Sequence, residues 1–209
     1  MVERHSKEIV EAIKKVNRPL TFLYGRKKVD PRDFDSIGTP KKVFGLSGSD
    51  PGQFSSPFGV AVDHYNNMIV SDQSNHRIQI FDEKGNHIKS FGSRGLGPDQ
   101  FTSPLGVAVD HHNNIIVCDY NNHRIQIFDD QGNHIKSFGS NGSGPGQFSN
   151  PVGVAVNHHN NIIVTESGNN RIQIFDDQGN HIKSFGSDGS DPGQFTYPYG
   201  VAVDHHNNI

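Results

Sequence analysis

The sequence is poor in the residues that build disulfide-stabilised or membrane-spanning proteins. It holds one cysteine, Cys118, among 209 residues, which excludes a disulfide framework and a cysteine-based zinc site. No run of 18 or more apolar residues occurs, so no membrane span and no membrane partner are predicted. The first residues lack the apolar core of a secretory signal, and we expect a cytoplasmic protein. Only 32% of the residues are hydrophobic while 23 are glycine, which favours short strands and tight turns.

Charge is distributed unevenly along the chain. Residues 1–43 hold 11 Lys and Arg against 6 Asp and Glu, whereas residues 44–209 hold 8 against 16. The longer segment is therefore acidic. Because nucleic-acid binding needs positive charge to offset phosphates, this balance favours a protein partner over RNA for that segment.

A 47-residue period organises most of the sequence. A phrase close to FGSxGxGPGQF begins at Phe44, Phe91, Phe138 and Phe185. A fixed period of this length indicates one supersecondary unit copied in tandem. The predicted repeats cover about residues 44–90, 91–137 and 138–184, followed by a partial copy at 185–209.

Each unit reads as four short strands, which we name a to d. In the second copy they are residues 106–110, 115–118, 124–128 and 134–138, separated by turns rich in Asn, Asp, Gly and His. Strands a and b are apolar and should be enclosed, whereas c and d alternate and should each show a polar face. Four-stranded units of this period, arranged radially, predict an all-β fold of the β-propeller type, with a stacked solenoid as the alternative.

The repeated residues resemble the NHL repeat. Residues 57–63, 67–72 and 75–81 follow its pattern, and Asn75-His76-Arg77 returns as 122–124 and, with Asn in place of His, as 169–171. The similarity covers roughly residues 41–209 and points to the C-terminal propellers of TRIM-type proteins. It implies a ring of about six blades that selects a target, while an N-terminal RING with B-boxes supplies ubiquitin-ligase chemistry.

The repeat count and the first 40 residues suggest a piece of a longer protein. Three complete units plus partial ones leave open propeller edges, which invite self-association, and closure by a second copy is the alternative. Residues 1–40 read as an amphipathic helix, with Ile9, Val10, Ile13 and Val16 on one face, followed by a basic linker around residues 26–28. We interpret this segment as the remnant of an upstream region.

Two repeated polar patterns are candidates for chemical sites. Histidines recur in the a–b turns, at His111, His112, His158, His159, His205 and His206. No cysteine or carboxylate completes a tetrahedral set with them, so we expect no metal and no cofactor. Carboxylates at the end of strand b precede an arginine by five residues, in the pairs Asp72 and Arg77, Asp119 and Arg124, Glu166 and Arg171. Because the pair occurs in every complete copy, it predicts structural bracing and no catalytic residue.

Differences between the copies predict a binding face. The a–b and c–d turns are nearly constant, whereas the d→a and b→c loops, which share the other end of a propeller, vary. The variable positions are Phe58, Gln73, Leu105, Tyr120, Val152, Ser167 and Tyr199. Ser49, Leu96, Ser143 and Ser190 vary more mildly. We expect this face to contact a partner.

The sequence thus favours a non-catalytic recognition module that binds a protein, as the target-binding part of a TRIM-like ubiquitin-ligase system. The first alternative is an RNA-binding propeller. A metal-dependent lyase or hydrolase is a third hypothesis, but an active site needs unlike residues converging on one substrate, and near-identical blades do not supply them.

Overall fold

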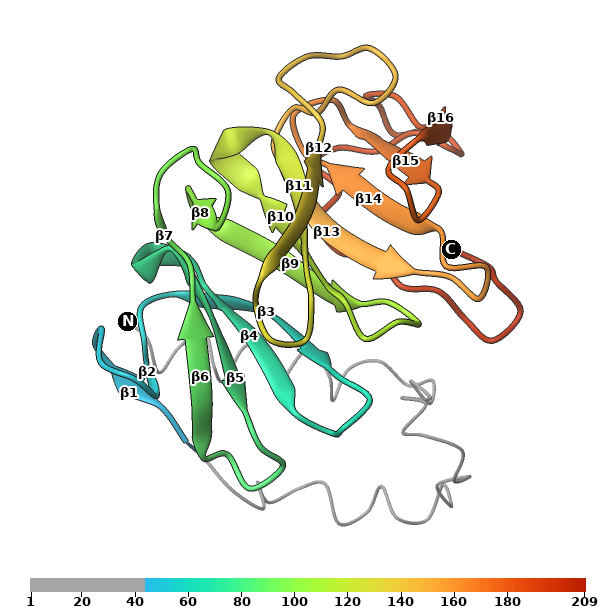
Figure 1. Ribbon diagram of the computed structural model, residues 1–209. Helices are drawn as coiled ribbons and strands as arrows, with labels where there is room; N and C mark the ends of the chain where they lie inside the picture. Colours follow the sequence, from blue (N-terminus) through green and yellow to red (C-terminus); the bar gives the residue numbers. More distant parts are fainter. Residues whose placement is uncertain (1–43) are drawn as a thin grey trace. The chain divides into compact units, whose positions relative to one another are not determined.

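The computed structural model describes residues 44–209, which form three four-stranded antiparallel sheets (Figure 1). The predicted helix at residues 9–16, the basic linker and the start of the strand predicted at residues 41–44 lie outside the described residues. Within the described part, no helix is long and apolar enough to cross a membrane.

Each sheet is one propeller blade, with its strands paired in chain order from the inside outward. Blade 1 comprises β3 (Pro57–Val62), β4 (Met68–Asp72), β5 (Arg77–Phe81) and β6 (His87–Phe91). Blade 2 comprises β9 (Pro104–Val109), β10 (Ile115–Asp119), β11 (Arg124–Phe128) and β12 (His134–Phe138). Blade 3 comprises β13 (Pro151–Val156), β14 (Ile162–Glu166), β15 (Arg171–Phe175) and β16 (His181–Phe185). The all-β, propeller-type prediction is confirmed.

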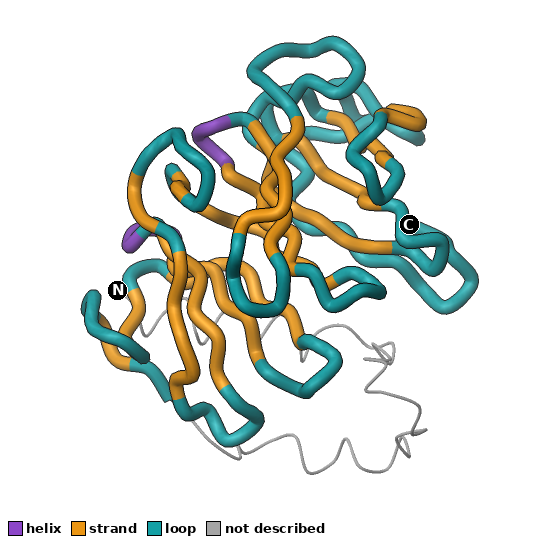
Figure 2. The backbone as a smooth tube through the Cα atoms, in the orientation of Figure 1, coloured by secondary structure: helices purple, strands orange, loops and turns teal. Residues whose placement is uncertain are grey.

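The connections give the blades two different ends. Each d→a loop folds back on itself through a short parallel pair, β1 (Leu46–Ser47) with β2 (Gln53–Phe54) and β7 (Ser93–Arg94) with β8 (Gln100–Phe101). Single 3-10 turns, η2 (Gln73–Asn75) and η3 (Tyr120–Asn122), form b→c connections at the same end (Figure 2). We call this end the loop face, and the end carrying the a–b and c–d turns the turn face.

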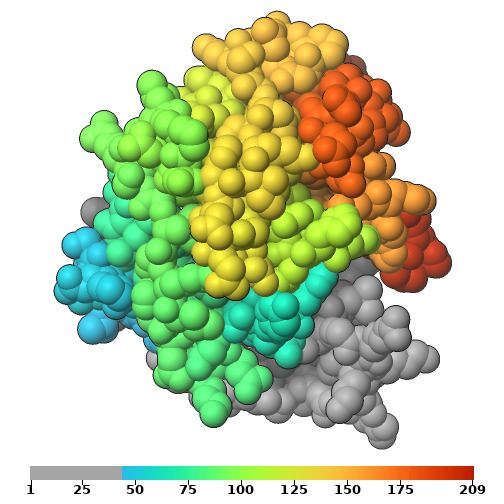
Figure 3. Space-filling model, viewed as in Figure 1, coloured from blue at the N-terminus to red at the C-terminus, as the bar shows by residue number. Residues whose placement is uncertain are grey.

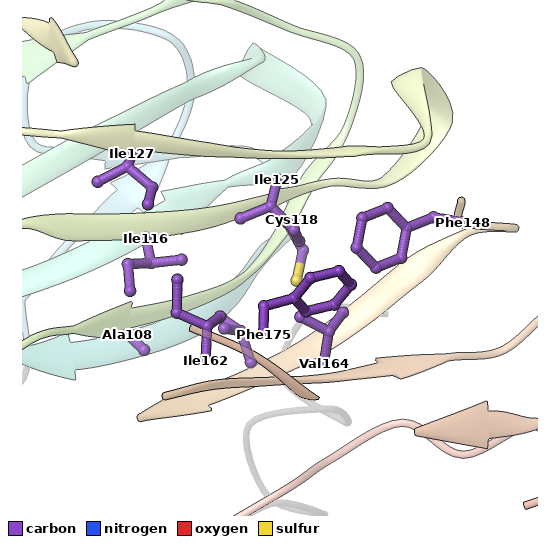
Figure 4. Packing of buried hydrophobic residues seen from close by; sticks show 10 residues of the cluster. Ala108, Ile116, Cys118, Ile125, Ile127, Phe148, Ile162, Val164 and Phe175 are labelled. Carbon is purple, nitrogen blue, oxygen red and sulfur yellow. The ribbon is translucent and has the colours of Figure 1, made fainter. Parts of the chain in front are cut away.

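The hydrophobic core lies between blades. Val107, Val117 and Phe128 of blade 2 pack with Ile69 and Ile78 of blade 1. The alternate residues of blade 2 point the other way: Ala108, Ile116, Cys118, Ile125 and Ile127 form a cluster with Val154, Ile162, Val164 and Phe175 of blade 3 (Figure 4). Strand alternation therefore gives each blade a preceding side and a following side, and Figure 3 shows the blades packed in chain order.

Phenylalanine rings pack together in the outer part of each junction between blades. Phe91, at the end of one blade, lies 4.9 Å between ring centroids from Phe128 of the next, and Phe101 of the intervening loop lies 5.5 Å from the same ring. Equivalent trios are Phe44, Phe54 and Phe81, and Phe138, Phe148 and Phe175. The FG…QF phrase of the sequence is thus the junction between successive blades.

Glycine sets the spacing of the innermost strands, where β9 lies between β3 and β13. A Cβ on Gly106 would meet the carbonyl oxygen of Val152, and one on Gly59 would meet that of Leu105. Only a residue without a side chain allows the strands to approach this closely.

One prediction about strand burial was wrong, and another holds for two of the three blades. The alternation of strand c predicted a polar face, but Gln79, Gln126 and Gln173 are fully buried, because the d→a loop covers them and accepts their hydrogen bonds. Strand a is enclosed in β9 and β13 but exposed along β3.

Candidate functional site

A buried carboxylate organises the loop face of each blade. In blade 2, Asp119 is fully buried and accepts hydrogen bonds from the backbone N–H of Thr102 at 2.8 Å and from Nδ2 of Asn122 at 2.8 Å. Arg124 Nε donates to it at 2.9 Å and Gln126 Nε2 at 3.1 Å. Four donors on one carboxylate make a satisfied polar network, which rigidifies the region it joins.

The arginine of this network holds the d→a loop. Arg124 donates to the carbonyl oxygens of Leu96, Gly97 and Gln100 at 2.8–2.9 Å. The predicted carboxylate–arginine pair forms in all three blades, with distances of 2.8 Å for Asp72 and Arg77, 2.9 Å for Asp119 and Arg124, and 2.6 Å for Glu166 and Arg171. The guanidinium groups therefore make their hydrogen bonds to the carboxylate and the d→a loop of their own blade.

Electrostatics also argues for a structural role of the carboxylate. Burial raises the pKa of Asp119, while hydrogen bonds from Thr102, Asn122 and Arg124 act in the opposite direction. A carboxylate enclosed by its own donors has no open side toward a substrate.

The middle residue of the Asn-His-Arg motif accepts a hydrogen bond that joins one blade to the next. The backbone N–H of Ser103 donates to Nδ1 of His76 at 3.1 Å, and that of Asn150 donates to Nδ1 of His123 at 3.1 Å. In the third copy the N–H of Tyr197 donates to Oδ1 of Asn170 at 2.8 Å. Asn replaces His in the third motif without loss because both present an acceptor at this point.

The repeat position shared by Ser71, Cys118 and Thr165 is a second link between blades. Thr165 Oγ1 donates to the carbonyl of Tyr199 at 2.9 Å, and Ser71 Oγ donates to that of Leu105. Burial, followed by the nearby Asp119 carboxylate, raises the pKa of the Cys118 thiol, so the thiolate form is disfavoured.

The predicted contact residues fall into a buried group and a group that is exposed or half-buried. Leu105 and Val152 are 4% and 0% exposed, and Ser167 is also buried, so these three offer no surface to a partner. Leu105 and Val152 are covered because β9 lies between β3 and β13, and β13 lies between β9 and the segment around Tyr199. Phe58 and Tyr199, at the two ends of the row, are 48% and 58% exposed, and Gln73 and Tyr120 are half-buried on the loop face.

The d→a loops hold exposed positions whose residues differ between copies and which are absent from the predicted contact residues or were predicted to vary only mildly. One repeat position holds Ser47, Arg94, Asn141 and Asp188, all exposed and all different. Another holds Leu96, 75% exposed, where the other copies have serine. Aligning the four copies column by column would have found the first position, since it holds a different residue in each copy.

The repeated histidines lie on the turn face and do not converge. Asn160 Oδ1 accepts from the backbone N–H of His111, and Asn160 Nδ2 lies 3.3 Å from His112 Nδ1, so these residues join neighbouring blades. Among residues 44–209, no group of three His, Cys, Asp or Glu side chains could hold a metal ion.

Comparisons with known proteins agree with this architecture. The family described as "NHL repeat" matches residues 101–128 and 148–175. A 50-residue stretch is 44% identical to the E3 ubiquitin-protein ligase TRIM71 of Gallus gallus, covering 24% of this chain and 6% of that protein. Protein brain tumor of Drosophila melanogaster is 58% identical over 38 residues, covering 18% of this chain and 4% of that protein. The matches thus span a small part of the relatives' length.

Solved structures share the fold. A streptogramin B lyase superposes with a TM-score of 0.58 at 18% identity, covering 78% of this chain and 49% of that chain. Hydrazine synthase of Kuenenia stuttgartiensis gives a TM-score of 0.56 at 18% identity, covering 78% and 42%. At this identity the likeness concerns the propeller fold alone.

Proposed function

We propose that this chain, whose propeller blades carry NHL repeats, is a non-catalytic recognition module that binds a protein target through its loop face. One observation carries the proposal: an invariant internal frame displays side chains that differ from blade to blade. The carboxylate, arginine and glutamine of each blade fix the loop backbone, while Arg94, Asn141 and Asp188 project from equivalent points. Rigid loops with different exposed groups suit specific recognition.

The chemistry of the loop face favours protein over RNA. The guanidinium groups of Arg77, Arg124 and Arg171 are engaged by carboxylates and loop carbonyls. On the turn face, Lys89 and Lys136 donate to backbone carbonyls of the next blade at 2.9 and 2.7 Å. Few cations remain to offset phosphates, whereas exposed Leu96 and half-buried Tyr120 suit an apolar contact.

The setting we propose is a TRIM-like ubiquitin-ligase system in the cytoplasm, in which this module selects the target. The support is the similarity to relatives named as ubiquitin ligases and the NHL repeats themselves. A RING requires about eight Cys and His ligands, which a chain with one cysteine cannot supply. Ligase activity would therefore come from another domain or subunit.

Binding through the loop face can be tested with substitutions that copy residues from other blades. The double variant Arg94→Ser, Leu96→Ser installs the residues found at Ser47 and Ser143, so the loop frame should persist. The control variant Glu83→Asp, Lys84→Gln gives blade 1 the turn of blade 2 at Asp130 and Gln131, on the opposite face. Affinity capture with quantitative mass spectrometry should show target proteins lost by the first variant and retained by the second.

Equal capture by all three proteins would overturn the proposal for this face. The RNA alternative is addressed by a mobility-shift assay with random RNA at about 50 mM salt, where electrostatic binding is strongest. We expect no salt-sensitive binding in the submicromolar range, and such binding would favour the RNA hypothesis instead.

A further inference from the structure

The loop between β7 and β8 contains a residue in a backbone conformation that favours glycine. Asp99 has a φ of 60°, in the left-handed region. The other copies hold glycine at this position, namely Gly52, Gly146 and Gly193, with φ of 81°, 73° and 84°. Strained non-glycine residues of this kind cluster at functional sites, where the side chain serves a purpose other than folding.

Asp99 also lacks a hydrogen bond that its counterparts make. The N–H of Gly52 donates to Oε1 of Gln79 at 3.0 Å, and the N–H of Gly146 makes the equivalent bond in blade 3 at 3.1 Å. Within residues 44–209, Oε1 of Gln126 in blade 2 accepts only from a serine hydroxyl, at 3.4 Å. The aspartate therefore lowers the stability of its own loop.

The same loop differs from the other copies at two more positions. Arg94 is exposed, and Leu96 is 75% exposed. At these two positions the other copies hold Ser47, Asn141 and Asp188, and Ser49, Ser143 and Ser190. Among residues 44–209, the Arg94 guanidinium and the Asp99 carboxylate find no hydrogen-bond or ion-pair partner. Two charged groups and one apolar side chain of this loop are thus available to a partner.

The backbone beneath these side chains is fixed. Besides the bonds from Arg124, the loop carbonyl of Gly95 accepts from Nδ2 of Asn122 at 2.8 Å. The backbone N–H of Asn121 donates to the carbonyl of Thr102 at 3.1 Å. These bonds tie η3 to the loop and place half-buried Tyr120 beside it. A fixed backbone with free side chains lowers the entropic cost of binding.

We propose that the β7–β8 loop and Tyr120 bind an extended segment of the target protein, with an acidic residue for Arg94, an apolar residue for Leu96 and a basic residue for Asp99. β7 and β8 pair Arg94 with Phe101, two residues after Asp99, so the Cα atoms of Arg94 and Asp99 lie within about 12 Å. About four or five extended residues span this distance. The inference rests on the proposed function and assigns its main contact to blade 2.

The test begins with selection of random phage-displayed peptides of about 12 residues on the intact chain. We expect enriched peptides to share an apolar residue with an acidic and a basic residue within about five positions. The affinity of an enriched peptide, measured by fluorescence anisotropy, should fall at least about tenfold in Leu96→Ser and in Asp99→Gly. The control Asn141→Ser makes an exchange between copies in the loop of blade 3 and should bind like the parent.

Thermal unfolding separates binding from folding. Asp99→Gly restores the residue of the other copies, so its melting temperature should equal the parent's or exceed it by up to about 4 °C while its affinity falls. Arg94→Glu should lose the selected peptide, and changing the peptide's acidic residue to lysine should restore binding, because the pair of charges is then reversed.

Two results with peptides would overturn the proposal: no enrichment of peptides that carry both charges, or equal affinity of the parent and Asp99→Gly. In the capture experiment described above, targets lost by Arg94→Ser, Leu96→Ser but retained by Asp99→Gly would overturn this inference and leave target binding through the loop face intact. Salt-sensitive binding of random RNA that disappears in Arg94→Ser would assign the loop to nucleic acid instead.

Discussion

Nδ2 of Asn160, in blade 3, lies 3.3 Å from Nδ1 of His112, in blade 2, so an amide donates a hydrogen bond across the junction. The preceding junction has Asn113 and Tyr65 at the corresponding positions. There Nδ2 of Asn113 is buried with no hydrogen-bond partner. A single difference between copies, tyrosine in place of histidine, therefore leaves one junction with an unsatisfied donor.

Tyr65→His should stabilise the protein. The new imidazole would accept from Asn113 Nδ2 and raise the free energy of unfolding by about 1 kcal/mol. The matched substitution His112→Tyr should lower it by about 1–3 kcal/mol, because it orphans Asn160 Nδ2. Urea denaturation followed by circular dichroism measures both. A destabilised Tyr65→His variant would show that the amide is satisfied in another way.

His76 should make stability depend on pH. Burial, and then the neighbouring Arg94, lowers the pKa of His76, whose Nδ1 must be neutral to accept from the N–H of Ser103. The unfolded state, with a histidine pKa of about 6.5, therefore binds more protons than the folded state as pH falls. The free energy of unfolding should decrease on acidification below about pH 7.

The variant His76→Asn isolates this contribution. Asparagine fills the same role at Asn170 and does not titrate, so the variant should lose less stability between about pH 7.5 and pH 5.5 than the parent. Denaturation midpoints at the two pH values provide the comparison. Identical pH dependence in both proteins would assign the effect to other groups.

Breaking a buried brace should cost far more than removing an exposed charge. Arg124→Gln leaves the Asp119 carboxylate buried without its cation and frees three loop carbonyls, and we expect a loss of about 3–5 kcal/mol. Arg94→Gln removes the same charge from an exposed position and should change stability by about 0.5 kcal/mol or less. Similar losses in both variants, measured by thermal and urea unfolding, would contradict the bracing role.

Cys118 should be chemically inert yet sensitive to polarity. The Cys118→Thr variant gains the hydroxyl that links blades at Thr165 and should keep its stability. Cys118→Val has nearly the same shape but leaves the N–H of Gly106 unpaired, and we expect it to be about 1–3 kcal/mol less stable than the threonine variant. Alkylation of the parent thiol should occur only on unfolding. Rapid labelling of the native chain would refute the assigned burial.

The 47-residue period and the turn chemistry correctly predict three blades, because both are local features of the sequence. The errors arise where distant segments meet. Gln126 alternates with isoleucines and reads as exposed, but the loop around Gln100 covers it and accepts its hydrogen bond. Leu105 reads as a loop-face residue, but the neighbouring inner strands enclose it. Alternation describes one strand and carries no information about the element that packs on it.

The predictions about functional residues divide in the same way, between contacts local in the sequence and contacts between distant segments. Pairing of Asp119 with Arg124 is predictable from a spacing of five residues on one hairpin. The hydrogen bond between His76 and Ser103 joins residues 27 positions apart, and it is visible only in the three-dimensional structure of the junction. Comparison of copies nevertheless carries this information in part, since Asn170 stands where the other two copies have His76 and His123 while the acceptor chemistry is kept.

Gly59, Gly106 and Gly153 let each inner strand lie close to the inner segment that follows it, so all three blades make the same contact. Any copy can therefore stand beside any other without a tailored partner. A gene duplication or deletion in register with the 47-residue unit would insert or remove a whole blade while keeping the same glycine contact at each remaining junction. The array is thus built to vary in length by whole units, and near-identical neighbours are the sequence arrangement in which such recombination is easiest.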